Sequence, residues 1–523
     1  MSTTQSDRPE APQPNRQLVF LIGEAQLSHY ELARLVREAL ARRGLPAKCT
    51  HHNVRRWCEG RATRAVPPFV IAEVLSSQLG REVTPWDIGL AGSGRRRPAG
   101  AAALLDSPAE ITATARAMWA SDLGEANALQ LSLPAPALAA PALRWLVASA
   151  PFGPTGTGGP DSPAVTDALV DNIRYQSLLF DTLAQRQGGG AARASAVQYL
   201  HTHLGPLLTG RFDVTTGRDL FDAAALATWT TARHTADTAL HGWSRRYFIL
   251  ALSMAHQAGD RLLGAQILVS LAHHLLSAGD TSPALDLIRA AQLAVERDDS
   301  PPFAELFAVE AQAHTERGDE TATLLALTAA DKALASAGPD TPDWLTFGAG
   351  ELFTTRAQCQ LALGRFADAA QAAREALDRL PPDRLRTATI ARLQLGGALC
   401  RLGDDRRATE AAEHALALTD GLSSQLVGAQ LGLTAYHFQD TRGGADPLSI
   451  QLRSSATRLT QLKPSPSPPP PPSATLTSSH RSDATCLPSR RVGAMAVGPS
   501  RRGGGAAGVA TLPGRGRAGG PGG

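Results

Sequence analysis

The stretch LGRFADAAQAAREALDRLP (residues 363–381) decides the fold, because a helix-ending turn is followed at once by a helix with a small-residue face. Gly364 is the type of residue that closes a helix, since it adopts a left-handed backbone conformation without steric cost. Ala369 and Ala376 follow about two helical turns apart on one face. The stretch therefore predicts two helices that approach each other closely across a tight turn.

The same pattern recurs in three other places, at AGDTSPALDLIRAAQLA (278–294), RGDETATLLALTAADKALA (317–335) and LGDDRRATEAAEHALAL (402–418). The turn glycines are Gly279, Gly318, Gly364 and Gly403, and they are spaced by 39, 46 and 39 residues. Small residues stand five positions after the glycine (Ala284, Ala369, Ala408) and twelve after it (Ala291, Ala376, Ala415). One helix pair cannot bury its apolar face alone, so we expect the pairs to stack into an α-solenoid over residues 166–440.

This repeat resembles the tetratricopeptide repeat, most clearly at Gly364, Phe366, Ala369, Ala376, Leu377 and Pro381. It departs from that family in a spacing above the usual 34 residues and in Thr323, where an alanine is expected. Less regular helix pairs extend the solenoid upstream through RRYFILALSMAHQAGDRLLGAQILVSLAHHLL (245–276). The resemblance implies a surface that binds a peptide, a protein or a partner subunit. The whole chain is expected to be all-α.

The N-terminal part predicts four helices in a compact unit over residues 16–92. They are RQLVFLIGEA (16–25), SHYELARLVREALARRG (28–44), THHNVRRWCEG (50–60) and PPFVIAEVLSSQLG (67–80). Ser28 and Glu31 form a capping box at the start of the second helix. Thr50 opens the third helix and Gly60 closes it, and prolines occupy the first turn of the fourth.

The third helix divides into an apolar and a cationic side. Val54, Trp57 and Cys58 project to one side, while His52, Arg55 and Arg56 project to the other, with His51 and Asn53 at the flanks. Two adjacent arginines on a short exposed helix, placed after a capped helix and a loop, suit a helix-turn-helix that reaches base edges and phosphates in a major groove. A merely solvated face is the alternative interpretation.

The candidate DNA contacts on this helix are His51, His52, Asn53, Arg55 and Arg56, and the candidate phosphate contacts around it are Arg61, Arg64, Lys48, Arg42 and Arg43. The charge balance agrees with this interpretation. Residues 16–97 contain 14 Lys and Arg against 7 Asp and Glu, whereas the whole chain has a net charge of only +3. The basic N-terminal region, and not the body, is therefore expected to meet a polyanion.

A metal site is the competing interpretation of CTHHNVRRWCEG (49–60), because Cys49, His51 and Cys58 could lie within reach of one ion. Cys58 is in line with Val54 and Trp57, however, and would serve as a small buried residue. The spacing also matches neither a zinc finger nor a paired Cys-x-x-Cys motif. We therefore expect neither a metal nor any other cofactor.

LSHYELARLV (27–36) followed by NVRRWCEGRATRAVPPFVIAEVLSSQLGREVTPWDIGL (53–90) resembles the Cro/C1-type helix-turn-helix domain of large transcriptional regulators from mycelial, streptomycete-type actinobacteria. The likeness continues through ARAMWASDL (115–123), LRWL (143–146), AVQYLHTHLGPLLTGRF (196–212) and residues 245–280. The resemblance implies sequence-specific binding of double-stranded DNA. One departure is ARRGLPAKCTHH (41–52), which is longer than the tight turn of the compact motif.

Two further regions carry weaker patterns. Residues 93–165 are rich in Gly, Pro, Ala and Ser, which predicts a linker around a partly helical piece centred on Trp119 and Trp145. Few long-range contacts are expected at its ends. Beyond Thr441 the periodicity ends, so residues 441–523 are expected to be a disordered tail without a specific role. A translated wrong reading frame in GC-rich DNA is an alternative origin of that tail.

The remaining features exclude several classes of protein. The most apolar long stretch, residues 129–152, is broken by four prolines and Arg144, so no membrane span is expected. An odd set of five scattered cysteines does not form a disulfide framework, which favours the cytoplasm. GPTGTGGP (153–160) is not a Walker A motif, because no lysine in the chain follows a glycine. The pairs His201 with His203 and His273 with His274 are more typical of surface or core features than of ligands.

No catalytic constellation stands out, so the chain is not expected to be an enzyme. The expected partners are double-stranded DNA and a peptide or protein ligand of the solenoid, with a homodimer as a further option. The leading hypothesis is a cytoplasmic, sequence-specific DNA-binding transcriptional regulator. The alternative hypothesis is a scaffold of tetratricopeptide type that does not bind DNA. Salt-sensitive binding to DNA separates the two.

Overall fold

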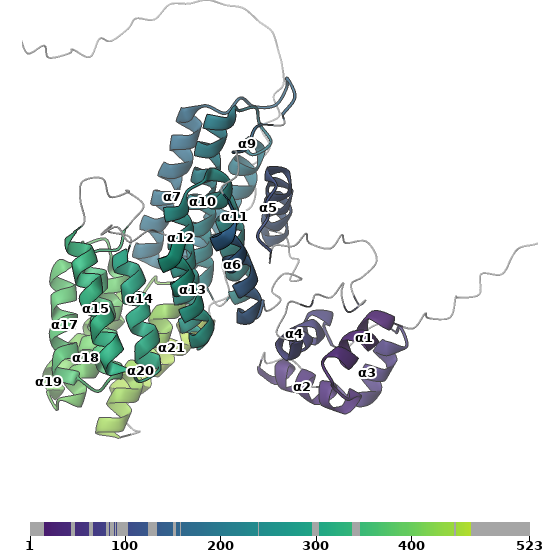
Figure 1. Cartoon of the computed structure of the whole chain (residues 1–523). Helices are drawn as coiled ribbons and strands as arrows, with labels where there is room; N and C mark the ends of the chain where they lie inside the picture. Colours follow the sequence, from purple (N-terminus) through teal and green to yellow (C-terminus); the bar gives the residue numbers. More distant parts are fainter. Residues whose placement is uncertain are drawn as a thin grey trace, which may run out of the picture. The chain divides into compact units, whose positions relative to one another are not determined.

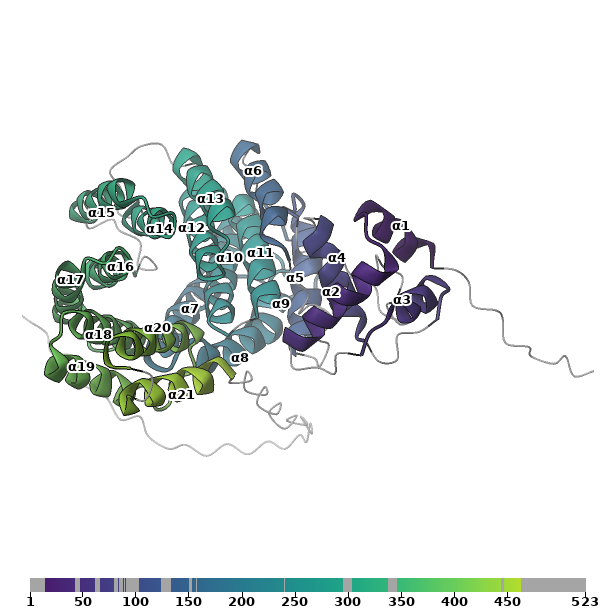
Figure 2. The same ribbon diagram turned by 90° about the horizontal axis from the view of Figure 1, so that it is seen from below.

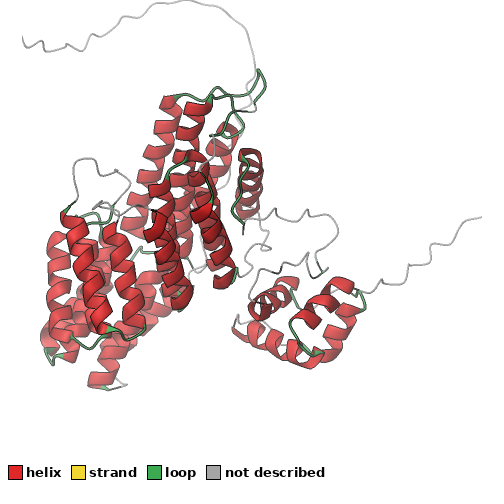
Figure 3. Ribbon diagram, viewed as in Figure 1, coloured by secondary structure: helices red, strands yellow, loops and turns green. Residues whose placement is uncertain are grey.

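The computed structural model describes residues 15–42, 48–61, 66–79, 83, 88, 90, 103–123, 133–149, 153–156, 158–238, 240–294, 303–336, 346–443 and 446–461. The regular elements in these ranges are helices, as Figure 3 shows, so the expected all-α fold is confirmed. None of the helices in these ranges has both the length and the apolar character needed to cross a bilayer.

The N-terminal unit contains the four expected helices (Figure 1): α1 (Arg16–Glu24), α2 (His29–Arg42), α3 (His51–Cys58) and α4 (Pro68–Leu79). The Ser28–Glu31 capping box is present, because the Ser28 backbone N–H donates to Glu31 Oε2 at 2.8 Å and the Glu31 N–H donates to Ser28 Oγ at 3.2 Å. These hydrogen bonds lower the pKa of Glu31. The four helices enclose one apolar core that includes Leu32, Val54, Trp57 and Ile71.

Asn15 ties three parts of this unit together, a role that local sequence patterns did not reveal. Its Oδ1 accepts from the Leu18 N–H at 3.1 Å and so caps α1. Its own N–H donates to the Cys58 carbonyl at 2.8 Å, and its Nδ2 donates to the Ile88 carbonyl at 2.7 Å. The C-terminal end of α3 is thereby fixed to the start of α1.

The segment between the two regions is more integrated than a linker. It forms α5 (Pro108–Leu123), the short 3₁₀ helix η2 (Ala135–Leu138) and α6 (Ala139–Val147). Trp119 and Trp145 are fully buried in the core of the larger helical domain. The helical piece around the two tryptophans is thus confirmed. The expectation of few long-range contacts is wrong at the C-terminal end of the region, where the N–H groups of Gly156 and Val165 donate to the Phe212 and Arg211 carbonyls. Most of the N-terminal end, residues 93–102, lies outside the described residues.

Specific contacts explain why this segment packs so firmly. The Arg261 guanidinium donates to the Trp145 carbonyl at 2.9 Å and lies 4.3 Å from the centre of its ring. Gly264 provides the space for that ring, since a Cβ at this position would lie 2.3 Å from Trp145. Asp122 accepts from Arg193 at 2.7 Å and from the Tyr247 hydroxyl at 2.7 Å. These contacts of Trp145 and Asp122 could not be predicted from the sequence, because the residues around them are mostly Gly, Pro, Ala and Ser.

The larger domain continues as antiparallel helix pairs that stack along the chain (Figures 1 and 2). Its first part contains α7 (Asp167–Gln187), α8 (Gly189–Tyr199), the π-helical turn η3 (Leu200–Leu204) and α9 (Gly205–Leu207). The pairs are α10 (Val214–Ala236) with α11 (His241–Ala258), α12 (Arg261–Ser277) with α13 (Thr281–Ala294), α14 (Phe303–Glu316) with α15 (Glu320–Ala335), α16 (Ala349–Ala362) with α17 (Phe366–Arg379), α18 (Leu385–Arg401) with α19 (Asp405–Leu418), and α20 (Gln425–Arg442) with α21 (Pro447–Gln461).

The repeat pattern has the expected structural basis. Gly279, Gly318, Gly364 and Gly403 all have positive φ, between 71° and 83°. The alanines five and twelve positions later are buried in the helix-pair interfaces. Thr323, which stands where an alanine is expected, is also fully buried, and its hydroxyl donates to the Asp319 carbonyl at 2.7 Å. The backbone of its own helix thus satisfies the extra polar group.

An aspartate directly after the turn glycine caps the next helix in several pairs. Asp319 accepts from the Ala322 N–H at 3.0 Å, and Asp404 accepts from the Arg407 N–H at 3.2 Å. Asp260 makes the same bond to the Leu263 N–H, at 2.8 Å, one helix upstream of the first recognised copy. A Gly-Asp pair therefore ends one helix and begins the next.

The first helices of successive pairs contact one another and form an inner row, which consists of α10, α12, α14, α16, α18 and α20. Helix α7 packs against α10 near one end of this row and against α18 near the other (Figure 2). A segment that precedes the repeats therefore joins helices that are far apart in the sequence.

Helix α21 contradicts the expectation that the chain is disordered after Thr441. It pairs with α20 and buries Leu452 and Leu459 in the C-terminal apolar core. Its apolar residues are few and separated by serines, threonines and arginines, so its periodicity was easily overlooked. The last helix pair is thus completed by a capping helix. The rest of the expected tail, residues 462–523, lies outside the described residues.

We expect Leu452→Ala to lower the free energy of unfolding by about 2 to 5 kcal/mol, because it leaves a cavity in the core beneath α21. Urea denaturation followed by circular dichroism measures this change. Gln451→Ala is the matched control, since Gln451 is the exposed neighbour on the same helix. Equal stability of the two variants would contradict a structural role for α21.

Candidate nucleic-acid interface

Helix α3 has the two faces expected from its sequence. Val54 and Trp57 are buried, with only 3% of Trp57 exposed, while His51, His52, Arg55 and Arg56 are exposed. Cys58 is half-buried. The apolar face anchors the helix in the domain core, so its orientation within the domain is fixed and the cationic face points to solvent.

The N-terminal end of α3 is held by hydrogen bonds from both sides. Asn53 Oδ1 accepts from the Thr50 N–H at 2.9 Å and from the Thr50 hydroxyl at 2.8 Å. Arg37, on α2, donates to the Cys49 carbonyl at 3.2 Å. The side-chain oxygen of Asn53 is therefore used to cap α3, and only its amide NH₂ group remains to donate to a base. Asn53 could then contact DNA as a hydrogen-bond donor but not through this oxygen.

An aromatic stack extends the exposed surface at this end. Tyr30, on the first turn of α2, stacks on His51 with ring centres 5.8 Å apart, and the His51 and His52 rings lie 4.0 Å apart. Tyr30 is 67% exposed despite its size. Sequence reasoning missed it because it belongs to another helix and only the fold brings it next to His51.

One carboxylate lies between two arginines at the C-terminal end of α3. Glu59 Oε1 is 3.1 Å from Arg55 Nε, and its Oε2 is 3.8 Å from Arg61 Nε. The Arg55 side chain remains 70% exposed. Because the pair engages Nε, the two terminal nitrogens of Arg55 can still form a fork toward an acceptor pair such as guanine O6 and N7.

Three of the five expected phosphate contacts around α3 lie among the described residues. Lys48, Arg42 and Arg61 are exposed, whereas Arg43 and Arg64 lie outside the described residues. We call the exposed set His51, His52, Arg55, Arg56, Lys48, Arg42 and Arg61 the α3 surface. It joins residues from the end of α2, the following loop and both ends of α3.

The cysteines around α3 have the properties of core residues. Cys49 is buried, and this burial raises its pKa to about 11. Burial also raises the pKa of Cys58, whose Sγ lies 3.9 Å from His29 Nε2. Metal ligation requires thiolates, which both shifts oppose. Within the described ranges, no three His, Cys, Asp or Glu side chains gather as metal ligands would.

The other candidate sites are occupied by structural contacts. In the 153–160 loop, the N–H groups of Gly156 and Gly158 donate to the Phe212 and Gly210 carbonyls, so they are not free to cradle a phosphate. His203 stacks on Tyr199 at 5.1 Å, and His274 packs among Phe248 and His241. These histidines behave as surface and core residues.

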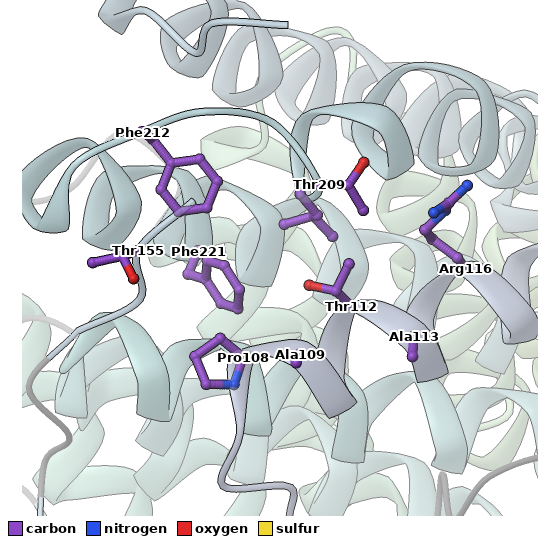
Figure 4. Close-up of a pocket in the computed structure, with 10 residues that line it drawn as sticks. Pro108, Ala109, Thr112, Ala113, Arg116, Thr155, Thr209, Phe212 and Phe221 are labelled. Atoms are coloured by element: carbon purple, nitrogen blue, oxygen red, sulfur yellow. The ribbon is translucent and has the colours of Figure 1, made fainter. Parts of the chain in front are cut away.

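A half-open pocket lies beside α5 in the larger domain (Figure 4). Thr112, Arg116, Phe212 and Phe221 contribute to its walls, together with Pro108, Ala109, Ala113, Thr155, Leu208 and Thr209. Among the described residues that line it, there are hydroxyls and one guanidinium but no carboxylate, imidazole or thiol. This described lining therefore offers no general base or metal ligand.

Comparison with known proteins found one family. Residues 18–91 match the family model of the SP15 N-terminal domain, and this range runs from within α1 to beyond the end of α4. No curated protein matches the chain. The four-helix unit is thus similar to the SP15 N-terminal domain.

We expect Trp57→Ala to unfold the N-terminal unit, because the loss of a buried indole costs about 3 to 5 kcal/mol. Hydrogen exchange with mass spectrometry on the full chain measures this locally, as lost protection in α1 to α4 with unchanged protection in α10 to α20. Arg56→Ala, on the exposed face of the same helix, is the control and retains protection. Unchanged exchange in Trp57→Ala would show that α3 is not anchored by its apolar face.

Proposed function

We propose that this protein is a sequence-specific DNA-binding transcriptional regulator whose helix α3 enters the major groove and whose solenoid binds a protein or peptide. The observation that carries the proposal is the α3 surface. A short helix fixed in a core by Val54 and Trp57 presents adjacent arginines to solvent on its other side. Such a helix is rigid, cationic and narrow enough for a major groove.

The dimensions and charges of the α3 surface support this role. A helix with its side chains is about 10 to 12 Å across, comparable to the major-groove width of about 12 Å. Arg42 and Lys48 precede α3 and Arg61 follows it, so exposed cations that could contact phosphates flank the helix at both ends in the sequence. The capping bonds of Thr50 and the Arg37 contact hold the N-terminal end of the helix in place.

The competing function is a scaffold of tetratricopeptide type without DNA binding. In that case the exposed arginines would be only a solvated face and the helix pairs would carry the whole function. The excess of cations in residues 16–97 favours the regulator, since a docking domain has no need of it. A regulator of this type acts in the cytoplasm, requires no catalytic residues, and binds either as a single chain or as a homodimer, according to the symmetry of its operator.

Selection of bound duplexes from a random DNA library by the full chain tests this proposal. We expect an enriched site whose affinity falls with salt concentration, with a slope of about −0.9 per neutralised phosphate. A regulator should prefer that site to random duplex by at least about 10³. No enrichment and no salt-dependent affinity would instead favour the scaffold.

We expect Arg55→Ala and Arg56→Ala each to weaken binding to the selected site by about 1 to 3 kcal/mol, provided that the arginine makes a bidentate contact to guanine. Fluorescence anisotropy with the selected duplex and with random duplex measures this effect. Arg34→Ala is the control, because Arg34 is also exposed and ion-paired but lies on α2. Wild-type affinity in both α3 variants would exclude α3 as the recognition helix.

We expect Glu59→Gln to strengthen binding to random duplex but to reduce discrimination at the base that Arg55 reads. The change removes a negative charge near phosphates, and it also removes the partner that orients Arg55. The readout is the ratio of affinities for the selected site and for the site with that base pair replaced. Glu38→Gln, which breaks the equivalent Arg34–Glu38 pair on α2, should leave the ratio unchanged.

A further inference from the structure

Helix α7 is held in the larger domain by two different kinds of contact. Its N-terminal half places Val170 and Ile173 in the main apolar core. Its C-terminal half buries the polar residues Ser177, Asp181 and Gln185 together with Ala184. The two halves of one helix therefore differ in what stabilises them.

The polar half meets three arginines of the inner row. Asp181 lies 3.3 Å from Arg233 Nη2, near the end of α10, and 3.7 Å from Arg384 Nη1, directly before α18. With its amide oxygen facing α18, Gln185 accepts from Arg384 at 3.1 Å and from Arg386 at 3.2 Å. A carboxylate and an amide four residues apart on one helix face thus satisfy a cluster of guanidinium groups.

A clasp holds the end of this half in place. Asp237 accepts from the Gly189 N–H at 2.9 Å, from the Ser424 hydroxyl at 2.8 Å and from the Leu426 N–H at 3.1 Å. The backbone also pairs here, as the Ser423 N–H donates to the Gln187 carbonyl at 2.7 Å. A Cβ at Gly190 would lie 2.1 Å from Ser423 Oγ, so this close approach requires glycine.

The charges show what the inner row would lack without α7. Arg233, Arg384 and Arg386 carry three positive charges. From outside α7, Glu351 pairs with Arg384, Asp237 pairs with Arg386, and Glu305 interacts electrostatically with Arg233. Asp181 adds a carboxylate that pairs with both Arg233 and Arg384. Burial disfavours its charged form, but Arg233, His234, Arg384 and Arg386 outweigh that effect and lower the pKa of Asp181. The inner row therefore selects an anionic group at this position.

The packed arrangement also leaves hydrogen-bonding groups of the inner row unused. Both ring nitrogens of His234 and the Nε of Arg386 are buried without a partner among the described residues. Such groups are uncommon in stable interiors. The polar contacts of α7 are moreover weak net contributors to stability, since burial of charges offsets most of their attraction.

We propose that Arg233, Arg384 and Arg386 form a binding surface for an acidic helical segment of a partner protein, and that residues 177–187 of α7 occupy this surface in cis as an internal competitor. The partner segment presents a carboxylate and an amide or second carboxylate four residues apart, as α7 does. This inference deepens the protein-binding part of the proposed function and does not depend on DNA binding. A tethered competitor at millimolar effective concentration masks the surface until a stronger ligand displaces it.

A peptide with the sequence of residues 175–187, labelled with fluorescein, probes the surface on the full chain. The wild-type chain should bind it weakly, because its own α7 competes. Asp181→Ala and the isosteric Asp181→Asn weaken the internal competitor and should raise the affinity at least about tenfold. Asp171→Ala, at an exposed position of the same helix, is the matched control and should behave like the wild type.

Two further measurements test whether the gained affinity depends on the contact between the aspartate and the arginines. Addition of Arg384→Ala to Asp181→Asn should abolish the gained affinity, and so should a peptide in which the aspartate that corresponds to Asp181 is alanine. Circular dichroism establishes that each variant remains folded. Equal peptide binding by wild type, Asp171→Ala and Asp181→Asn, or binding that survives Arg384→Ala, would overturn the proposal. Operator binding is measured separately, so its loss or retention does not affect this conclusion.

Discussion

The close approach of paired helices is the constraint on which the larger domain depends. It is possible because alanines occupy the contact positions of each repeat, at Ala284 and Ala291, Ala369 and Ala376, and Ala408 and Ala415, all of which are buried. Small side chains bring the helix axes together and leave the larger apolar residues for contacts between pairs. The Gly-Asp turns then fix where each helix ends and the next begins. The inner row, and with it the arginine cluster, follows from this geometry.

Sequence patterns predicted the features that depend on neighbours along the chain. The turn glycines, the capping box at Ser28 and the two faces of α3 are local, so periodicity and residue type were sufficient. The packing of Trp145 against Gly264 and the clasp at Asp237 join residues more than a hundred positions apart. No local pattern encodes such pairs. The sequence analysis did not predict helix α21 for a related reason. Its few leucines form an apolar face that is recognisable only from their packing against α20.

The candidate site shows the same division between local and long-range information. The exposure of Arg55 and Arg56 follows from the helix period alone, whereas the contact of Tyr30 with His51 requires the fold. Asn53 illustrates how one residue can fit two roles in a sequence. Its position on the helix suggested a base contact, but its side-chain oxygen Oδ1 accepts hydrogen bonds from Thr50 and so caps the helix. Side chains at helix starts are therefore poor candidates for recognition until their capping bonds are known.

The two arginine clusters of this protein differ in their response to salt, and this difference separates the two proposed activities. The α3 surface is exposed, and its ion pairs lie within reach of solvent ions, so its attraction to phosphates falls steeply as ionic strength rises. The pairs of Asp181 and Asp237 with the inner row are buried, where screening is much weaker. Moderate salt is therefore expected to weaken the proposed DNA binding while the internal contacts of α7 persist. In the proposed competition, a partner segment and not the ionic environment is therefore expected to change the occupancy of the inner row.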